Sequence, residues 1–119
     1  MEQALYEFLN AEMTIPVYYL KAPDDSGLPR IVFTPISESR QYDTEVRKMR
    51  LQVSIWHDDR YAGIALREEV YDVLQRYKGV LGGIGVHEIG LETQNVIYEP
   101  EIRAYQYALD FMVTYKGEQ

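Results

Sequence analysis

Alternating apolar and polar side chains make residues 104–115 the most regular stretch of the sequence. A period of two is typical of a strand with one buried face, so a strand is predicted over residues 102–115. Three apolar side chains of this strand are expected to face the core: Leu109, Phe111 and Val113. Three polar side chains are expected to face away from it: Gln106, Asp110 and Thr114.

Three further stretches predict strands. Residues 49–56 alternate in the same way, and Trp56 falls on the polar-facing side, either beneath a helix or at an interface. Residues 31–36 are apolar and β-prone, with Pro35 limiting the pairing or marking a bulge. Residues 15–20 are expected to form an edge strand or a strand start, because a proline inside them lacks an amide donor.

Apolar residues at helical spacing predict two helices. Residues 2–11 read as a short amphipathic helix, and residues 60–77 carry one apolar stripe along a longer helix. Asp58 or Asp59 is placed to cap the longer helix at its start. Gly79 is the expected stop at its end.

The remaining segments connect these elements. Residues 38–48 are polar and predict an exposed connection or a protruding hairpin. Residues 82–85 are glycine-rich and predict a flexible return to a strand over residues 86–91, whereas residues 94–101 predict a loop. We therefore predict one α+β domain over residues 1–119, with a mainly antiparallel sheet of four to five strands, two helices on one face and a projecting strand or hairpin.

The last predicted strand is long for so small a domain. At about 3.3 Å per residue, its 14 positions extend about 46 Å, whereas a compact domain of this length is about 35 Å across. Part of the strand, or of its partner strand, is therefore expected to bulge or to project past the body. Such projections commonly contact a neighbouring molecule.

Composition narrows the classes of function. The 119 residues contain no cysteine, which excludes disulfides, thiolate nucleophiles and cysteine metal sites. The net charge of −7 disfavours binding to nucleic acid or to an anionic membrane, and the N-terminus lacks the pattern of a secretory signal. Eleven tyrosines against three phenylalanines favour a protein interface, where tyrosine is enriched.

Candidate catalytic chemistry is sparse. His57 and Asp58 could supply a base or metal ligands, but a helix start needs an acidic cap at the same place. Ser54 lies on the opposite strand face from His57, so the two do not converge as nucleophile and base. The glycine-rich segment has no lysine to contact a phosphate. We expect no catalytic, metal-binding or cofactor-binding residues and no enzymatic activity. A small hydrolase or metal enzyme using His57 and Asp58 is the alternative.

A basic cluster in an otherwise acidic chain suggests a second kind of site. Arg40, Arg47, Lys48 and Arg50 either pair with nearby acidic residues or dock onto an acidic partner surface. The full set of interface candidates adds aromatic side chains to these four: Trp56, Tyr98, Tyr105 and Tyr107.

Several segments together resemble one known family. They are the strand Leu51–Trp56, the helix Tyr61–Tyr77 with its Ala-Leu-Arg-Glu-Glu-Val run, and Tyr98-Glu99-Pro100-Glu101 followed by Tyr105 and Leu109–Val113. The family is the tail-terminator, or tail-completion, family of long-tailed phages, prophages and gene transfer agents. The N-terminal Leu5–Leu9 and Pro29–Phe33 segments also fall where that family has a helix and a strand.

The resemblance implies a homohexameric ring that caps the finished tail tube, stops its polymerisation and presents a surface to the head connector. The implied partners are further copies of the chain, the major tail tube protein and the head connector or completion protein. Genome DNA would pass through the ring without specific binding, and neither a membrane nor a cofactor is implied. The implied location is the head-proximal end of the virion tail, after synthesis in the bacterial cytoplasm. A head–tail adaptor or another phage assembly module without the capping role is the alternative.

Overall fold

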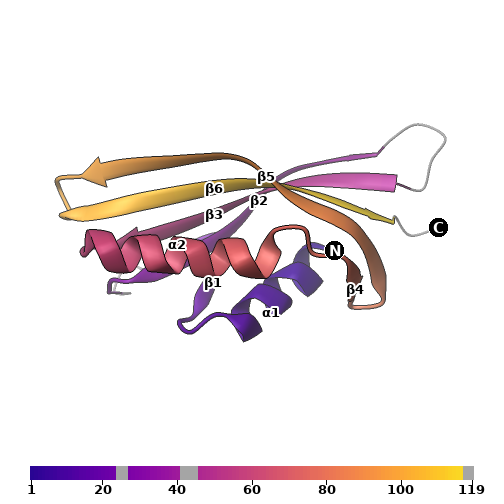
Figure 1. Cartoon of the computed structure of the whole chain (residues 1–119), viewed down its shortest axis with the longest axis horizontal. Helices are drawn as coiled ribbons and strands as arrows, with labels where there is room; N and C mark the ends of the chain where they lie inside the picture. The colour runs from indigo at the N-terminus through magenta and orange to yellow at the C-terminus, as the bar shows by residue number, and fades with distance from the viewer. Residues whose placement is uncertain (24–26, 41–45, 117–119) are drawn as a thin grey trace.

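The computed structural model describes residues 1–23, 27–40 and 46–116. In chain order its elements are α1 (Glu2–Glu12), β1 (Val17–Tyr19), β2 (Arg30–Arg40), β3 (Val46–His57), α2 (Arg60–Leu74), β4 (Gly79–Leu81), β5 (Ile84–Glu99) and β6 (Ala104–Lys116). These strands form one sheet of six in the order β1-β2-β3-β6-β5-β4 (Figure 1). The α+β prediction is confirmed, with one or two strands more than expected.

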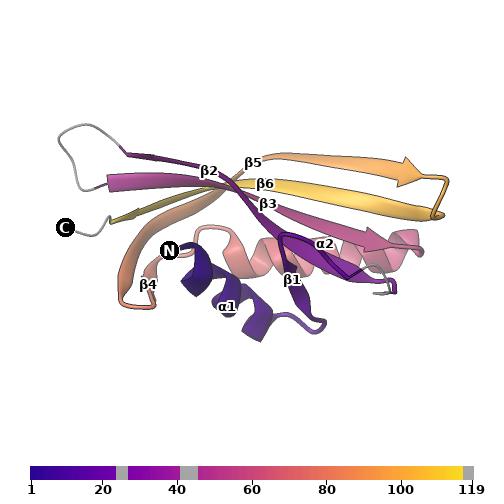
Figure 2. The ribbon, with the colours of Figure 1, turned by 180° about the vertical axis from the view of Figure 1, so that it is seen from behind.

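The sheet is mixed and curled. The β1–β2 pair is parallel and the other pairs of the described strands are antiparallel. Both helices lie on the same side of the sheet, as predicted (Figures 1 and 2). Helix α2 packs along β3 and β6, whereas α1 contacts both β1 and β4, which belong to opposite margins of the sheet. The sheet therefore bends around α1, and neither of the described helices lies on its other side.

The hydrophobic core lies between the helices and the central strands β3 and β6. Leu51 is in register with Phe111 and Val53 with Leu109, and all four side chains are fully buried. The inward face predicted for the last strand is confirmed, because Val113 is fully buried as well. The outward face is only partly covered, because no helix lies over it.

The molecule is elongated along its strands, with extents of 48 × 25 × 24 Å. Strand β6 pairs with β3 without a bulge, and the register shifts fall in β2 and β5. The bulge in β2 lies between Pro35 and Ser37, which confirms the prediction made from the proline. The long strands therefore set the length of the molecule. The β5–β6 turn lies at one end of its long axis (Figure 1).

Helix α2 begins where the sequence predicts and ends earlier. Asp59 is its N-cap, because its Oδ1 accepts the backbone N–H groups of Tyr61 and Ala62 at 2.9 and 3.1 Å. The expected stop at Gly79 is wrong. Arg76 already adopts a left-handed φ of 60°, and its N–H donates to the Ile89 carbonyl at 2.7 Å. This tertiary hydrogen bond turns the chain toward the sheet, which the helical periodicity does not reveal.

One glycine fixes how closely α2 approaches the sheet. A Cβ at Gly63 would lie 2.5 Å from the Tyr107 ring, so a side chain there would displace the ring. The Tyr107 hydroxyl donates to the Arg60 carbonyl at 3.0 Å, in the first turn of α2. Tyr107 therefore links β6 to the start of the helix.

Two predictions for the segment after α2 need correction. The glycine-rich residues form a tight hairpin between β4 and β5, with Gly82 and Gly83 at φ values of 56° and 80°. The predicted loop over residues 94–101 is wrong, because β5 continues to Glu99 in register with β6. Most of this part of β5 is exposed on both faces, so its sequence lacks the alternation that marks a strand.

Candidate protein interface

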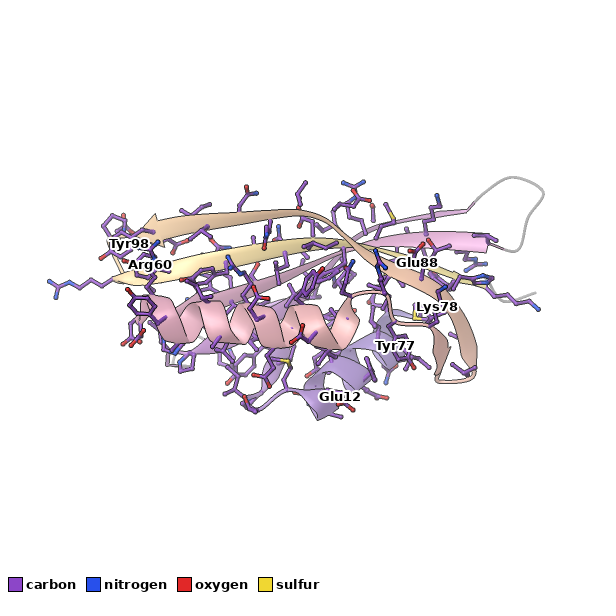
Figure 3. All side chains as sticks on the ribbon, viewed as in Figure 1. Glu12, Arg60, Tyr77, Lys78, Glu88 and Tyr98 are labelled. Atoms are coloured by element: carbon purple, nitrogen blue, oxygen red, sulfur yellow. The ribbon has the colours of Figure 1, made fainter. Side chains whose placement is uncertain are left out.

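The end of the β5–β6 hairpin exposes a group of large apolar side chains. On β5, Val96, Ile97 and Tyr98 are 53%, 52% and 49% exposed, and Ile102 in the turn is 43% exposed. Tyr61, at the start of α2, is 82% exposed. Arg60 and Tyr98 lie at the same end of the molecule in Figure 3. These five apolar residues form what we call the hairpin-end cluster, and exposed apolar groups of this kind mark protein contact sites.

Four members of the hairpin-end cluster are absent from the interface candidates predicted from sequence. Tyr98 is one of those candidates, whereas the sequence analysis does not single out the other four: Tyr61, Val96, Ile97 and Ile102. A signal was nevertheless present, because residues 96–98 are three consecutive apolar positions. On a strand, consecutive side chains point to opposite faces, so both faces of this hairpin must carry apolar groups.

The backbone edge beside the cluster is open. Strand β4 pairs only with residues 84–86 of β5, so residues 93–99 have β6 on one side and no other described strand on the other. Their side chains from Thr93 to Tyr98 include neither a proline nor a charged residue. Natural proteins usually block an exposed edge with such residues. This part of β5 is therefore competent to contact another protein chain.

The opposite edge of the sheet is closed at its first residue, Val17. The Tyr6 hydroxyl donates to the Val17 carbonyl at 2.7 Å, and the Val17 N–H donates to Asn10 Oδ1 at 2.8 Å. Side chains of α1 thus satisfy the outward backbone groups of Val17 at the start of β1, which lies beside α1 in Figure 2. Further along this edge, Pro35 lacks a donor and a bulge interrupts β2. The two edges therefore differ in their capacity to pair.

The predicted tyrosine candidates divide between surface and core. Tyr98 and Tyr105 are in register on the hairpin, and their ring centroids lie 5.0 Å apart. Tyr107 is only 1% exposed and packs against Gly63, with the Arg67 guanidinium 5.6 Å from its ring centroid. Tyr107 is therefore a core residue of the subunit, and its prediction as an interface residue is corrected. Apolar alternation alone does not show which tyrosines a helix covers.

Trp56 is in register with outward-facing Gln106, on the face of the sheet that neither described helix covers. The predicted alternative that placed Trp56 beneath a helix is therefore wrong. The Arg30 guanidinium lies 5.1 Å from its ring centroid, which is a cation–π distance. The ring also lines a surface pocket with Leu20 and Val32. Trp56 is half-buried and keeps an accessible side.

The predicted basic cluster is divided by the sheet. Arg47 is in register with inward-facing Tyr115, whereas Lys48 and Arg50 are in register with outward-facing Thr114 and Met112. Arg47 lies 3.8 Å from a carboxylate oxygen of Glu38, and Arg50 lies 3.4 Å from one of Glu92. These contacts favour the pairing alternative for both arginines. The side chain of Arg40 and residues 41–45 lie outside the described part of the chain.

Tyr115 has a perturbed ionisation at the same end of the sheet. Its side chain is buried, and its hydroxyl donates to the Glu38 carboxylate. Burial and then this hydrogen bond raise the pKa of Tyr115 above its ordinary value of 10.0. Burial also raises the pKa of Tyr107.

These shifts predict a loss of stability in alkali. Stability is expected to be complete below about pH 10 and to fall above it, because the unfolded chain then releases protons that the folded chain retains. Tyr115→Phe should make the decline shallower, since it removes one of these two raised pKa values. Urea midpoints measured from neutral pH to about pH 11 would test this. Tyr98→Phe is the control, and an unchanged decline in Tyr115→Phe would contradict the prediction.

The residues weighed for catalysis take part in the start of α2. The backbone N–H of Asp59 donates to His57 Nδ1 at 3.0 Å, so this nitrogen accepts a bond within the capping turn. Ser54 is in register with Ala108 and His57 with Tyr105, on opposite faces as predicted. Among the described residues, no three His, Asp or Glu side chains gather as a metal site. No helix in the described ranges is long and apolar enough to span a membrane.

Comparisons with known proteins agree with this architecture. Residues 3–116 match the family described as tail completion protein gp17. Among solved structures, 26 chains match the fold. One is a chain from the virion of a native gene transfer agent particle, with a TM-score of 0.73, 15% sequence identity, and coverage of 98% of this chain and 95% of that one. No curated protein sequence matches the chain. At 15% identity the structural likeness concerns the fold, whereas the family match spans nearly the whole sequence, and the chain therefore belongs to the tail completion protein gp17 family.

Proposed function

We propose that the protein is a structural component of a phage-like tail, which forms a ring on the end of the tail tube. The ring ends polymerisation of the tube and joins the tail to the head connector. The observation that carries this proposal is the family match over residues 3–116. The fold shared with a chain of the gene transfer agent virion supports it, because that chain belongs to an assembled particle.

The surface of the subunit suits assembly. The hairpin-end cluster places five large apolar side chains at one end of a 48 Å molecule, next to an open strand edge. Such a surface is stabilised when another chain covers it. The His57–Asp58–Asp59 segment is used in capping α2, and the proposed role needs no catalytic group.

The charge of the chain is compatible with a DNA conduit. A ring of six copies at −7 each would carry −42. Tight binding to DNA relies on clustered positive charge that neutralises phosphates, and Arg47 and Arg50 already face carboxylates. An acidic ring would thus hold the passing duplex only weakly. We place this ring at the head-proximal end of the tail, between the tube protein and the connector.

The test combines imaging with tube assembly. The full-length protein, examined by negative-stain microscopy and native mass spectrometry, is expected to form closed rings of six, alone or on tube ends. When it is added to polymerising tail tube protein, tubes should be shorter and carry extra density at one end. Unchanged tube lengths with bare ends would overturn the capping role. Binding to the connector without any effect on tubes would favour the head–tail adaptor.

A further inference from the structure

A surface pocket lies between α1 and β1, on the closed side of the sheet. Its volume is about 360 Å³, and its aromatic walls are Tyr6 and Tyr19, whose ring centroids are 5.5 Å apart. Polar side chains of α1 complete it: Glu2, Gln3 and Glu7. Gln3 donates a hydrogen bond to Glu7 at 3.3 Å and leaves its carboxylate exposed. The α1–β1 pocket therefore combines two tyrosine rings with two carboxylates.

The β5–β6 hairpin end has the complementary chemistry. Tyr98 and Ile102 expose apolar surface, and the turn also carries the exposed cation Arg103. Arg103 adopts a left-handed φ of 51°, and its N–H donates to the Pro100 carbonyl, so its backbone belongs to a formed turn. Two carboxylates lie near it in sequence, the half-buried Glu99 and the exposed Glu101. The apolar side chains of the hairpin end can contact the aromatic walls of the pocket, and the Arg103 guanidinium in the turn can pair with its carboxylates.

We propose that the hairpin end of one copy docks into the α1–β1 pocket of the next copy, with Arg103 facing Glu2 and Glu7. The inference rests on the proposed ring and names the surfaces that close it. The two surfaces differ and belong to opposite margins of the sheet, since β5 and β1 lie on either side of β2, β3 and β6. Contacts between two different surfaces repeat from copy to copy and close into a ring at a suitable rotation.

The contact is made by side chains and not by extension of the sheet. The outward backbone groups of Val17 already bond to Tyr6 and Asn10, so β1 offers no free pairing edge at this residue. Pairing of two open β5 edges is the competing arrangement. It joins like to like and would give pairs of subunits, because each copy has one such edge among its described strands. Charge complementarity between Arg103 and the pocket favours the hairpin-in-pocket contact.

Charge reversals of the full chain test this arrangement. Arg103→Glu places a carboxylate against the acidic pocket, and Glu7→Arg places a guanidinium against Arg103. Each single variant is expected to lose rings, with contacts at least ~10-fold weaker, because like charges then face each other. A mixture of the two variants should restore rings. In an alternating ring every hairpin meets a pocket of opposite charge, so the mixture also shows that both variants are folded.

The matched control is Glu12→Arg, which reverses an exposed charge of the same helix outside the pocket (Figure 3). Its rings should match those of the wild type in native mass spectra. Wild-type rings that persist in both single variants would overturn the hairpin-in-pocket contact and leave the proposed ring intact. Rings lost in both variants and not restored on mixing would overturn it as well. A wild type that stays monomeric, free and on tube ends, would overturn both proposals.

Discussion

Replacing Val96 and Tyr98 together by aspartate is expected to abolish ring assembly and to leave the monomer folded. Each residue is about half exposed, in the part of β5 where side chains from Glu92 to Tyr98 are exposed, so the carboxylates remain hydrated in the free subunit. The monomer loses the ring contact between Tyr98 and Tyr105, which is worth about 1 kcal/mol. Assembly would bury unpaired charges, so we expect each contact to weaken at least ~100-fold, or about 2.7 kcal/mol.

The matched control adds the same two charges elsewhere on the sheet. Ile36, in the β2 bulge, and Val80, on β4, are also exposed apolar strand residues, so aspartates there test for a general effect of charge. Native mass spectrometry and negative-stain images should show rings for this control and monomers for the hairpin variant. Circular dichroism should show both variants folded. Equal loss of rings in the two variants would contradict a role specific to the hairpin-end cluster.

Phe111→Ala is expected to cause a large loss of stability, the largest among the substitutions proposed for this protein. Phe111 is fully buried in the central strand β6, between Leu51 on β3 and Leu91 on β5. Truncation removes apolar contacts and leaves a cavity that neighbours on three strands cannot close, at a cost of about 3–5 kcal/mol. This is a large share of the ~5–15 kcal/mol that typical domains possess. Urea unfolding followed by circular dichroism measures the difference directly.

The next residue along the strand provides the control. Met112 points to the face without helices and is half-buried, in register with Arg50 and Gly90. Met112→Ala therefore removes fewer contacts and leaves no enclosed cavity, so about 1 kcal/mol is expected. Similar losses of stability for the two variants would show that both faces of β6 pack equally tightly. This would contradict a core that lies on the helix-covered face alone.

The sequence predicts well those parts of the fold whose local pattern and tertiary packing agree. In β3 and β6 a period of two coincides with one helix-covered face, so the pattern predicts both strands and their inward residues, although β3 begins at Val46, inside the segment interpreted as a connection or hairpin. Asp59 and Pro35 act through local hydrogen bonding, so the helix cap and the bulge were predicted as well. The order of the strands depends on pairing between distant segments, which none of these patterns encodes.

The errors arise where tertiary contacts decide the outcome. The end of α2 depends on a bond from Arg76 to Ile89, and the burial of Tyr107 depends on the space left by Gly63. Neither face of the second half of β5 is buried by other elements, so polar and apolar residues do not alternate there and the sequence predicts a loop. For the candidate interface, Tyr98 was predicted from its residue type. Its apolar neighbours require knowledge of which surfaces the helices leave uncovered.

The open edge at residues 93–99 also affects how the protein can misassemble. Fibrous β-aggregates grow because each added strand presents a fresh edge to the next molecule. A native subunit that pairs through residues 93–99 would present the opposite margin, where Tyr6 and Asn10 occupy the backbone groups of Val17 and Pro35 lacks a donor. Growth through β1 is therefore blocked at Val17, and growth through β2 meets the bulge after Pro35. Both features of this margin disfavour extended fibrils of native subunits.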